Sequence, residues 1–247
     1  MFQGGYKMTQ QIVLGEKDKF DFLTTLNETK ILDEPEQLKQ EQEENVVYIL
    51  SVKDKNSHFL SGANNKVYVP YIYLHGSHQE NDDVYIYFDL ENYPFFKKVK
   101  SVITKQEKPK GVFRYRRMTN TELSHSLIAG DLFVISSLFG RPEDIHVKQS
   151  SSNATRHIIL SVDFGGGQLA HIEYTQSIHE KIEMEWSGIK QIIEFDSDEV
   201  TPVQPGNHTS LPLSYSVDSV LHTAYKVDKN ILDRLQKYIK MLGGGVE

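Results

Sequence analysis

Residues 158–174 alternate apolar and polar side chains on either side of three consecutive glycines, Gly165, Gly166 and Gly167. A period of two is typical of a strand with one buried face, and glycine tolerates the backbone conformations of tight hairpin turns. The pattern therefore predicts an antiparallel hairpin with its turn at the glycines. The glycine run is not expected to bind phosphate, because no helix follows it.

A second hairpin is predicted over residues 181–196, with its turn at Ser187 and Gly188. Its first strand alternates apolar with acidic residues, which places the two kinds on opposite faces. The apolar side chains are Ile182, Met184 and Trp186, and the acidic side chains are Glu183 and Glu185. Two consecutive hairpins favour a mainly antiparallel sheet in this half of the chain.

Three apolar patterns predict helices in the same half. The first helix begins at Pro94, and the second covers residues 122–139 and ends at Gly140. The third has an apolar stripe over residues 231–242. Proline in a first turn and glycine after a last turn are ordinary helix boundaries. Residues 197–227 contain several prolines and are predicted to be mostly loop.

Residues 112–117 lie between the first two helices and read as a strand that carries three arginines. Arg114 and Arg116 would share one face of this strand, and Arg117 would lie on the other. Three arginines together can hold a phosphate or a carboxylate. Because the three are divided between two faces, the sequence favours a solvated basic edge.

The first ninety residues show a different pattern. Short apolar runs at 11–15, 46–50, 66–73 and 84–88 are separated by polar stretches. Such runs are typical of buried strands, with the stretches between them forming crossover helices. We therefore expect an α/β domain at residues 1–90. An α+β domain, with an open, mainly antiparallel sheet and helices on one face, is expected at residues 91–247.

Composition excludes several functions. Lys and Arg number 27 against 34 Asp and Glu, a net charge of −7, which disfavours nucleic acid as a partner. The sequence has no cysteine, which excludes disulfides, Cys-based metal sites and thiol nucleophiles. No apolar run reaches the length of a membrane span, and we expect a cytoplasmic protein without membrane contact. Two His, a Glu and two Asp share the loop at residues 75–83, but a short hydrophilic loop does not fix ligand geometry, so no metal site is predicted.

The order of parts over residues 92–196 resembles a known family. The helix that begins at Tyr93 and Pro94, the strand at Gly111, the helix that ends at Gly140 and the hairpin at residues 163–172 resemble consecutive parts of the Gfo/Idh/MocA family. This family includes glucose–fructose oxidoreductase and inositol dehydrogenase. The resemblance implies an N-terminal Rossmann domain that binds NAD or NADP. It also implies a C-terminal sheet that often forms the oligomer interface.

The cofactor motifs of that family are not recognisable here. Its G-x-G-x-x-G turn lets a pyrophosphate approach bare backbone amides. In this chain the first strand leads into one glycine, Gly15, followed by Glu16 and Asp18, whose carboxylates would repel a pyrophosphate. The family's Glu-Lys-Pro motif follows a Rossmann strand, where this chain has Pro-Tyr-Ile at residues 70–72. Residues 107–109 do read Glu-Lys-Pro, but they follow the wrong element and are interpreted as a turn.

The proton relay of the family is also missing. Its catalytic helix presents an Asp and, four residues later, a His. Spacing back from Gly140 places these positions at Ser126 and Gly130, which cannot relay a proton in the same way. His125 and Asp131 lie six residues apart, about 240° around a helix, and so do not share a face. They are interpreted as a surface His and an ordinary helical Asp, and no catalytic, cofactor-binding or metal residue is assigned.

These observations favour a shortened, degenerate and non-catalytic relative, a pseudoenzyme with a reduced Rossmann-like domain and no cofactor. It is expected to act through a homodimer formed by the C-terminal sheet, or through another protein partner. The expected interface residues are Ile159, Ile172, Tyr174, Ile182, Met184 and Trp186. The alternative is an active NAD- or NADP-dependent sugar or polyol oxidoreductase. A second alternative is a sensor of a small ligand.

Overall fold

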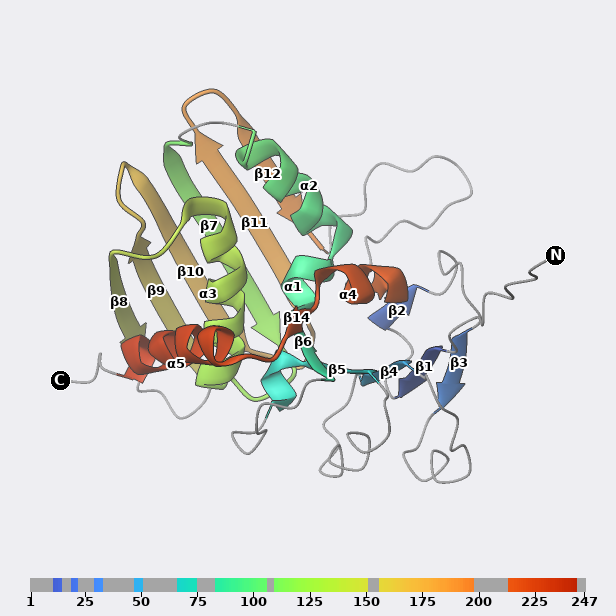
Figure 1. Ribbon diagram of the computed structural model, residues 1–247. Helices are drawn as coiled ribbons and strands as arrows, with labels where there is room; N and C mark the ends of the chain where they lie inside the picture. The colour runs from blue at the N-terminus through green and yellow to red at the C-terminus, as the bar shows by residue number, and fades with distance from the viewer. Residues whose placement is uncertain are drawn as a thin grey trace. The chain divides into compact units, whose positions relative to one another are not determined.

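The computed structural model describes residues 11–14, 19–21, 29–32, 47–50, 66–74, 83–105, 109–150, 156–197 and 213–243 (Figure 1). The chain divides into two compact units. The first unit contains residues 1–92 and 214–232, and the second contains residues 93–213 and 233–247. The predicted division assigned residues 214–232 to the second domain, whereas in the structure this segment returns to the first unit.

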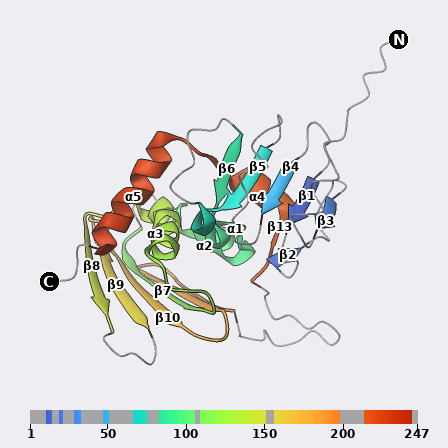
Figure 2. The ribbon, with the colours of Figure 1, turned by 90° about the horizontal axis from the view of Figure 1, so that it is seen from below.

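The first unit is built on a sheet in which five strands run parallel. The strands are β1 (Gln11–Leu14), β3 (Thr29–Leu32), β4 (Val47–Leu50), β5 (Lys66–Pro70) and β6 (Val84–Tyr87). Their order across the sheet is β3-β1-β4-β5-β6, as Figure 2 shows. All four pairings between these strands are parallel. The predicted buried strands are confirmed at β1, β4, β5 and β6, and β3 adds a fifth parallel strand. The predicted crossover helices before β5 lie outside the described residues.

The segment at residues 214–232 adds three short elements to the first unit. They are β13 (Tyr215–Ser216), α4 (Val217–Thr223) and β14 (Tyr225–Lys226). β14 pairs antiparallel with β6, and β13 pairs with β2 (Phe20–Asp21). Ser216 caps α4 by accepting a hydrogen bond from the amide of Ser219. The prediction that this stretch is mostly loop is therefore wrong for residues 215–226.

The second unit is built on a six-stranded sheet with the order β12-β11-β7-β10-β9-β8. Only the pairing of β7 with β10 is parallel. The bounds are β7 (Gly111–Thr119), β8 (Asp144–Gln149), β9 (His157–Asp163), β10 (Gln168–Gln176), β11 (Lys181–Gly188) and β12 (Ile192–Asp196). Both predicted hairpins, β9–β10 and β11–β12, are confirmed. The three turn glycines have φ values of 76°, 61° and 86°, which other residues rarely adopt.

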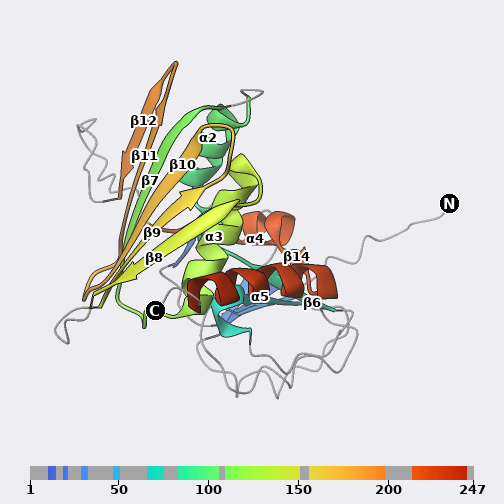
Figure 3. The same ribbon diagram turned by 90° about the vertical axis from the view of Figure 1, so that its left-hand side faces the viewer.

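Helices cover one face of this second sheet (Figure 3). They are α2 (Pro94–Ile103) and α3 (His125–Phe139), and α5 (Lys229–Gly243) contacts α3 through a hydrogen bond from Tyr238 to Ser136. α3 is capped by Ser124 and ends at Gly140. The covered face is apolar: Phe139 stacks on Trp186 with ring centroids 5.3 Å apart. The predicted fold class, an α/β part followed by an open antiparallel sheet with helices on one face, is confirmed.

Two predicted elements differ in detail. β5 ends at Pro70, and residues 71–73 form a short 3-10 helix instead of continuing the strand. β7 is a central strand with neighbours on both sides, so the predicted basic edge is wrong. Within the described ranges, no helix combines the length and apolar character that a bilayer crossing requires.

Candidate functional site

The order of the parallel strands creates a topological switch point. Along the chain, β1 is followed by β3 on one side and then by β4 on the other side. In open parallel sheets the connections diverge at such a point, and ligands bind in the crevice at the carboxyl ends of the two strands. Here those ends are Leu14 of β1 and Leu50 of β4. The candidate site is this carboxyl edge of the first unit.

Tyr87 links two strands at the carboxyl edge through a hydrogen bond. It is the last residue of β6, and its side chain is almost fully buried. Its hydroxyl donates a hydrogen bond of 2.5 Å to the backbone oxygen of Leu50. Because β5 lies between β4 and β6, this bond ties the ends of two strands that are not neighbours.

Two charged side chains, Lys19 and Asp89, follow strands that end at this edge. Lys19 Nζ lies 3.8 Å from Asp89 Oδ2, and both side chains are mostly buried. Tyr215 donates a hydrogen bond of 2.8 Å to the other oxygen, Oδ1, of Asp89. The ring of Tyr215 also packs edge-on against Phe20, with centroids 5.3 Å apart. The returning segment thus fixes Asp89, and Asp89 in turn holds Lys19.

The helical turn after β6, α1 (Asp89–Asn92), is held by the same returning segment. Tyr225 donates to the buried carboxylate of Glu91, at 3.0 Å to Oε2. The side-chain oxygen of Asn92 accepts hydrogen bonds from Ser219 and Thr223. Every polar side chain of α1 therefore contacts a residue that is more than 120 positions away in the sequence.

Tyr71 occupies the position after β5 where the family resemblance implies a lysine. Its side chain is buried, and burial raises the pKa of the Tyr71 phenol to about 12. It packs against Phe88 with ring centroids 5.3 Å apart. A buried, neutral phenol packs as a core residue and does not supply the positive charge of the missing lysine.

A buried polar network lies in the second unit, between β7, β10 and α3. Arg117 Nη1 lies 3.2 Å from both carboxylate oxygens of Asp131, and its Nη2 donates to Glu180 at 2.8 Å. Asp131 also accepts hydrogen bonds from Tyr115 at 3.0 Å and from Tyr174 at 3.2 Å. Arg117 is 3% exposed and Asp131 is 4% exposed.

Burial raises the pKa values of the carboxyl group and of the two tyrosines in this network. It raises the pKa of the Asp131 carboxyl, although the charge of Arg117 and the tyrosine hydrogen bonds oppose the rise. Burial and the neighbouring Asp131 charge raise the pKa of Tyr115 and of Tyr174 well above the ordinary value. The tyrosines therefore remain neutral donors at physiological pH.

The structure corrects the interpretation of α3. Asp131 is not an ordinary helical Asp but the buried partner of Arg117. His125 is the first residue of α3, and its Nε2 is buried with no hydrogen-bond partner among the described residues. Ser126 and Gly130 lie on the helix as expected from their spacing and offer no acid or base. The strand alternation had placed Arg117 on the face opposite Arg114 and Arg116, and that signal could have identified the buried pair.

The expected interface residues fall on two different faces. Ile172, Tyr174, Ile182, Met184 and Trp186 are buried on the helix-covered face of the second sheet. Their burial inside one chain removes them from any intermolecular interface. Ile159 alternates with the buried Ile158 and Leu160 and so lies on the other face, called here the open face.

The open face carries paired charges. Arg116 lies 3.1 Å from Glu173 and 2.8 Å from Glu183, and Arg114 pairs with Glu185. Hydrogen bonds from Arg116 and His171 outweigh partial burial and lower the pKa of the Glu173 carboxyl. The arginines that sequence analysis assigned to a solvated edge are therefore neutralised within the sheet.

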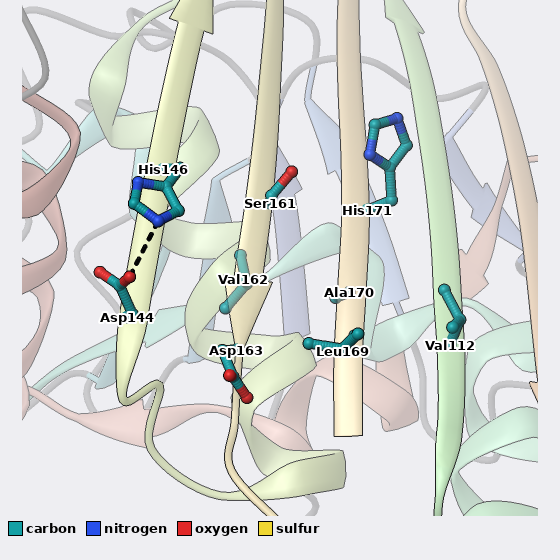
Figure 4. Close-up of a pocket in the computed structure, with 9 residues that line it drawn as sticks. All are labelled: Val112, Asp144, His146, Ser161, Val162, Asp163, Leu169, Ala170 and His171. Atoms are coloured by element: carbon teal, nitrogen blue, oxygen red, sulfur yellow. Dashed lines mark ion pairs between the residues drawn. The ribbon is translucent and has the colours of Figure 1, made fainter. Parts of the chain in front are cut away.

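One end of the open face is hollowed (Figure 4). The hollow, of about 320 Å³, has an apolar floor that includes Val112 and Leu169. His146 Nε2 lies 3.0 Å from Asp144 Oδ2 at its rim. The described residues include no group of three or more side chains that could hold a metal ion.

Three predicted motifs lie outside the described residues. They are the segment with Gly15, Glu16 and Asp18, the acid-rich loop at residues 75–82 and the Glu-Lys pair at 107–108. The described neighbours of the first segment are Leu14 at the end of β1 and Lys19.

The chain combines a unit built on a parallel sheet with a unit built on an open, mainly antiparallel sheet. The chain has the fold of Gfo/Idh/MocA-type dehydrogenases. No family profile matches the sequence, and no curated protein matches it by sequence.

Three solved structures illustrate the similarity. Myo-inositol dehydrogenase from Corynebacterium glutamicum is 12% identical, with a TM-score of 0.54 over 95% of this chain and 86% of that chain. A dehydrogenase from Chromobacterium violaceum is 9% identical, with a TM-score of 0.65 over 96% and 94%. An oxidoreductase from Agrobacterium radiobacter, in complex with NAD+, L-tartaric acid and magnesium, is 9% identical, with a TM-score of 0.59 over 97% of both chains. At these identities the similarity concerns the fold alone.

Proposed function

We propose that this protein is a nicotinamide-dinucleotide-dependent oxidoreductase that binds its cofactor at the carboxyl edge of the first unit. The observation that carries the proposal is the switch point between β1 and β4, where parallel sheets of this kind bind nucleotides. Structures with the same fold include an oxidoreductase in complex with NAD+ and a dehydrogenase in complex with NAD. Sugars and polyols are the proposed substrate class, and the cytoplasm is the proposed location.

The fit to the cofactor rests on this chain's own edge. Lys19, in an ion pair with Asp89, brings a cationic side chain to the carboxyl edge, while Glu16 and Asp18 add negative charge in the preceding segment of the sequence. When bound, a nicotinamide cofactor would accept or donate a hydride. The carboxylates predict weaker binding than a glycine-rich turn would give, because like charges repel the diphosphate.

The test is a calorimetric titration of the full chain with NADH and with NADPH. Saturable binding of one cofactor supports the proposal, and a shift of the thermal midpoint with ligand concentration should accompany it. Trp186 is buried in the second unit, so the intrinsic fluorescence of the dihydronicotinamide is a better optical signal than tryptophan quenching. Absence of binding at millimolar cofactor would contradict the proposal.

A second candidate is binding without turnover, the pseudoenzyme hypothesis. It is favoured by α3, where Ser126 and Gly130 replace the expected acid and base and Asp131 is held by Arg117. The two candidates separate in one assay that follows NADH formation by its absorbance over a panel of polyols. Cofactor binding with no substrate-dependent signal would select the second candidate.

We also propose that the open face mediates self-association. Leu169 is 46% exposed and Ile192 is 67% exposed, and both lie in one cross-strand row with Val112. Exposed apolar residues on a sheet face are typical of an interaction surface. Sedimentation at micromolar concentration should give a dimer, and Ile192→Lys should shift it toward monomer. A monomeric wild-type protein would overturn this proposal.

A further inference from the structure

Lys19 and Asp89 form a loose ion pair at the carboxyl edge. Their separation of 3.8 Å is longer than the roughly 2.7–2.9 Å of a charge-assisted hydrogen bond. The other oxygen of Asp89 accepts the shorter hydrogen bond from Tyr215, at 2.8 Å. Asp89 is therefore fixed mainly by Tyr215, and its own contact with the Lys19 ammonium group is the longer of the two.

The pair joins segments that follow two strands of the same sheet. Lys19 is the first described residue after β1, and Asp89 comes two positions after the last residue of β6. In the sheet, β4 and β5 lie between β1 and β6. The ion pair therefore connects two segments that flank the carboxyl ends of β4 and β5. These ends include the strand end at the switch point, where the proposed function places the ligand.

A lysine at this position can replace missing amide donors. Phosphate oxygens are bound in proteins either by bare backbone amides at a glycine turn or by cationic side chains, and lysine acts there as a mobile point charge. The segment after β1 has one glycine and two carboxylates, so its charge balance depends on its lysines. Among the described residues, Lys19 is the lysine that follows β1 at this edge.

We propose that Lys19 binds the diphosphate of the nucleotide and that Asp89 competes with the diphosphate for the Lys19 ammonium group. In the free protein Lys19 contacts Asp89, and on binding it exchanges this carboxylate for phosphate oxygens. Tyr215 keeps Asp89 in place during the exchange through its separate hydrogen bond to Oδ1. This inference rests on the proposed nucleotide binding, and it names the residue that makes such binding work without a glycine-rich turn.

The distinguishing result is that two partners of one ion pair have opposite effects. Lys19→Met should raise the Kd for NADH by about 10- to 100-fold, the range for losing a hydrogen bond to a charged group. Asp89→Asn, which removes the competitor, should lower the Kd by about 1.5- to 5-fold. A pair with only a structural role would change binding in the same direction in both variants.

The matched control is Lys66→Met. Lys66 is an exposed lysine at the first residue of β5, so it lies at the amino edge of the same sheet. The Lys66→Met substitution removes the same charge from the same unit. It should leave the Kd for NADH within about twofold of the wild-type value, because exposed charges at a distance are screened. Lys19→Arg keeps the charge and should retain most of the affinity. Thermal melts of each variant establish that it is folded.

Titration with ADP-ribose separates the contributions of the ligand. It carries the same diphosphate without the nicotinamide, so the ratio of Lys19→Met to wild-type Kd should equal the ratio measured with NADH. An unchanged Kd in Lys19→Met, or a higher Kd in Asp89→Asn, would overturn the inference while leaving nucleotide binding intact. Failure of the wild-type protein to bind NADH and ADP-ribose would overturn both the inference and the proposed function.

Discussion

The two faces of the second sheet use the same residue types in opposite ways. Arg116 and Arg117 are consecutive residues of β7, and each pairs with two carboxylates. The Arg116 side chain is 51% exposed on the open face, whereas that of Arg117 is 4% exposed beneath α3. Because successive residues of a strand point to opposite faces, one step along the chain moves a guanidinium from solvent into the core.

Burial decides the energetic role of an ion pair in this sheet. A buried charge loses its hydration and must be satisfied by its partners, and Arg117 and Asp131 satisfy this need with help from Tyr115 and Tyr174. Arg116 keeps much of its hydration and gains little from its partners. The buried network should therefore determine how α3 packs on the sheet. The ion pairs of the open face can break and form again with other partners.

The largest expected effect comes from breaking the buried pair. Arg117→Met should lower the free energy of unfolding by about 3–5 kcal/mol, because it leaves the Asp131 carboxylate buried without a cation. Urea denaturation followed by circular dichroism measures the change. A loss below about 1 kcal/mol, the range of exposed pairs, would mean that the buried network tolerates an unpaired charge as the open face does.

A double variant sharpens this result. Arg117→Met combined with Asp131→Leu removes both charges and should be less destabilising than Arg117→Met alone by about 1–3 kcal/mol, because no isolated charge remains. Urea denaturation of the two variants under identical conditions gives the difference. Additive losses would show that the two residues act independently.

A much smaller effect is expected on the open face. Arg116→Gln should lower the free energy of unfolding by about 0.2–1 kcal/mol, the range for exposed pairs, and added salt should reduce the difference further. Urea denaturation at low and at high ionic strength provides the measurement. A loss comparable to that of Arg117→Met would show that the proposed self-association buries Arg116 and removes its hydration.

The smallest effect is a pH dependence at Glu173. Its folded-state pKa is lowered, so its contribution to stability is present above the unfolded value of about 4.3 and is lost as the pH falls through the folded value. The difference in stability between wild type and Glu173→Gln should therefore shrink below about pH 4. Thermal melts from pH 7 to pH 3 check the sign, and a difference that grows on acidification would contradict it.

Local patterns predicted much of the fold. The hairpins, α2, α3 and α5 follow from periodicity and from glycine or proline at their ends, which are properties of neighbouring residues. β13, α4 and β14 were missed because they are very short and their partners are distant: Tyr215 contacts Asp89 and Tyr225 contacts Glu91 across more than 120 positions. Short-range sequence patterns carry no information about such contacts.

The candidate site was predictable only in part. The sequence predicted the two strands that form the switch point, β1 and β4. It did not predict the Lys19–Asp89 pair, because that pair depends on a long-range contact. The prediction that Asp131 is an ordinary helical residue was wrong. Helical spacing tests only partners on the same helix, such as His125, whereas its partner Arg117 lies on β7. Charges in separate elements can be matched from sequence only when the packing of those elements is known.

The return of residues 214–232 to the first unit has a consequence for biosynthesis. A ribosome delivers β6 and α1 long before β14, so the whole of the second sheet emerges while β6 still lacks its antiparallel neighbour. During that interval the edge of β6 exposes unpaired backbone groups and invites incorrect pairing. A nascent chain that stalls before residue 214 should therefore depend on chaperones until translation resumes.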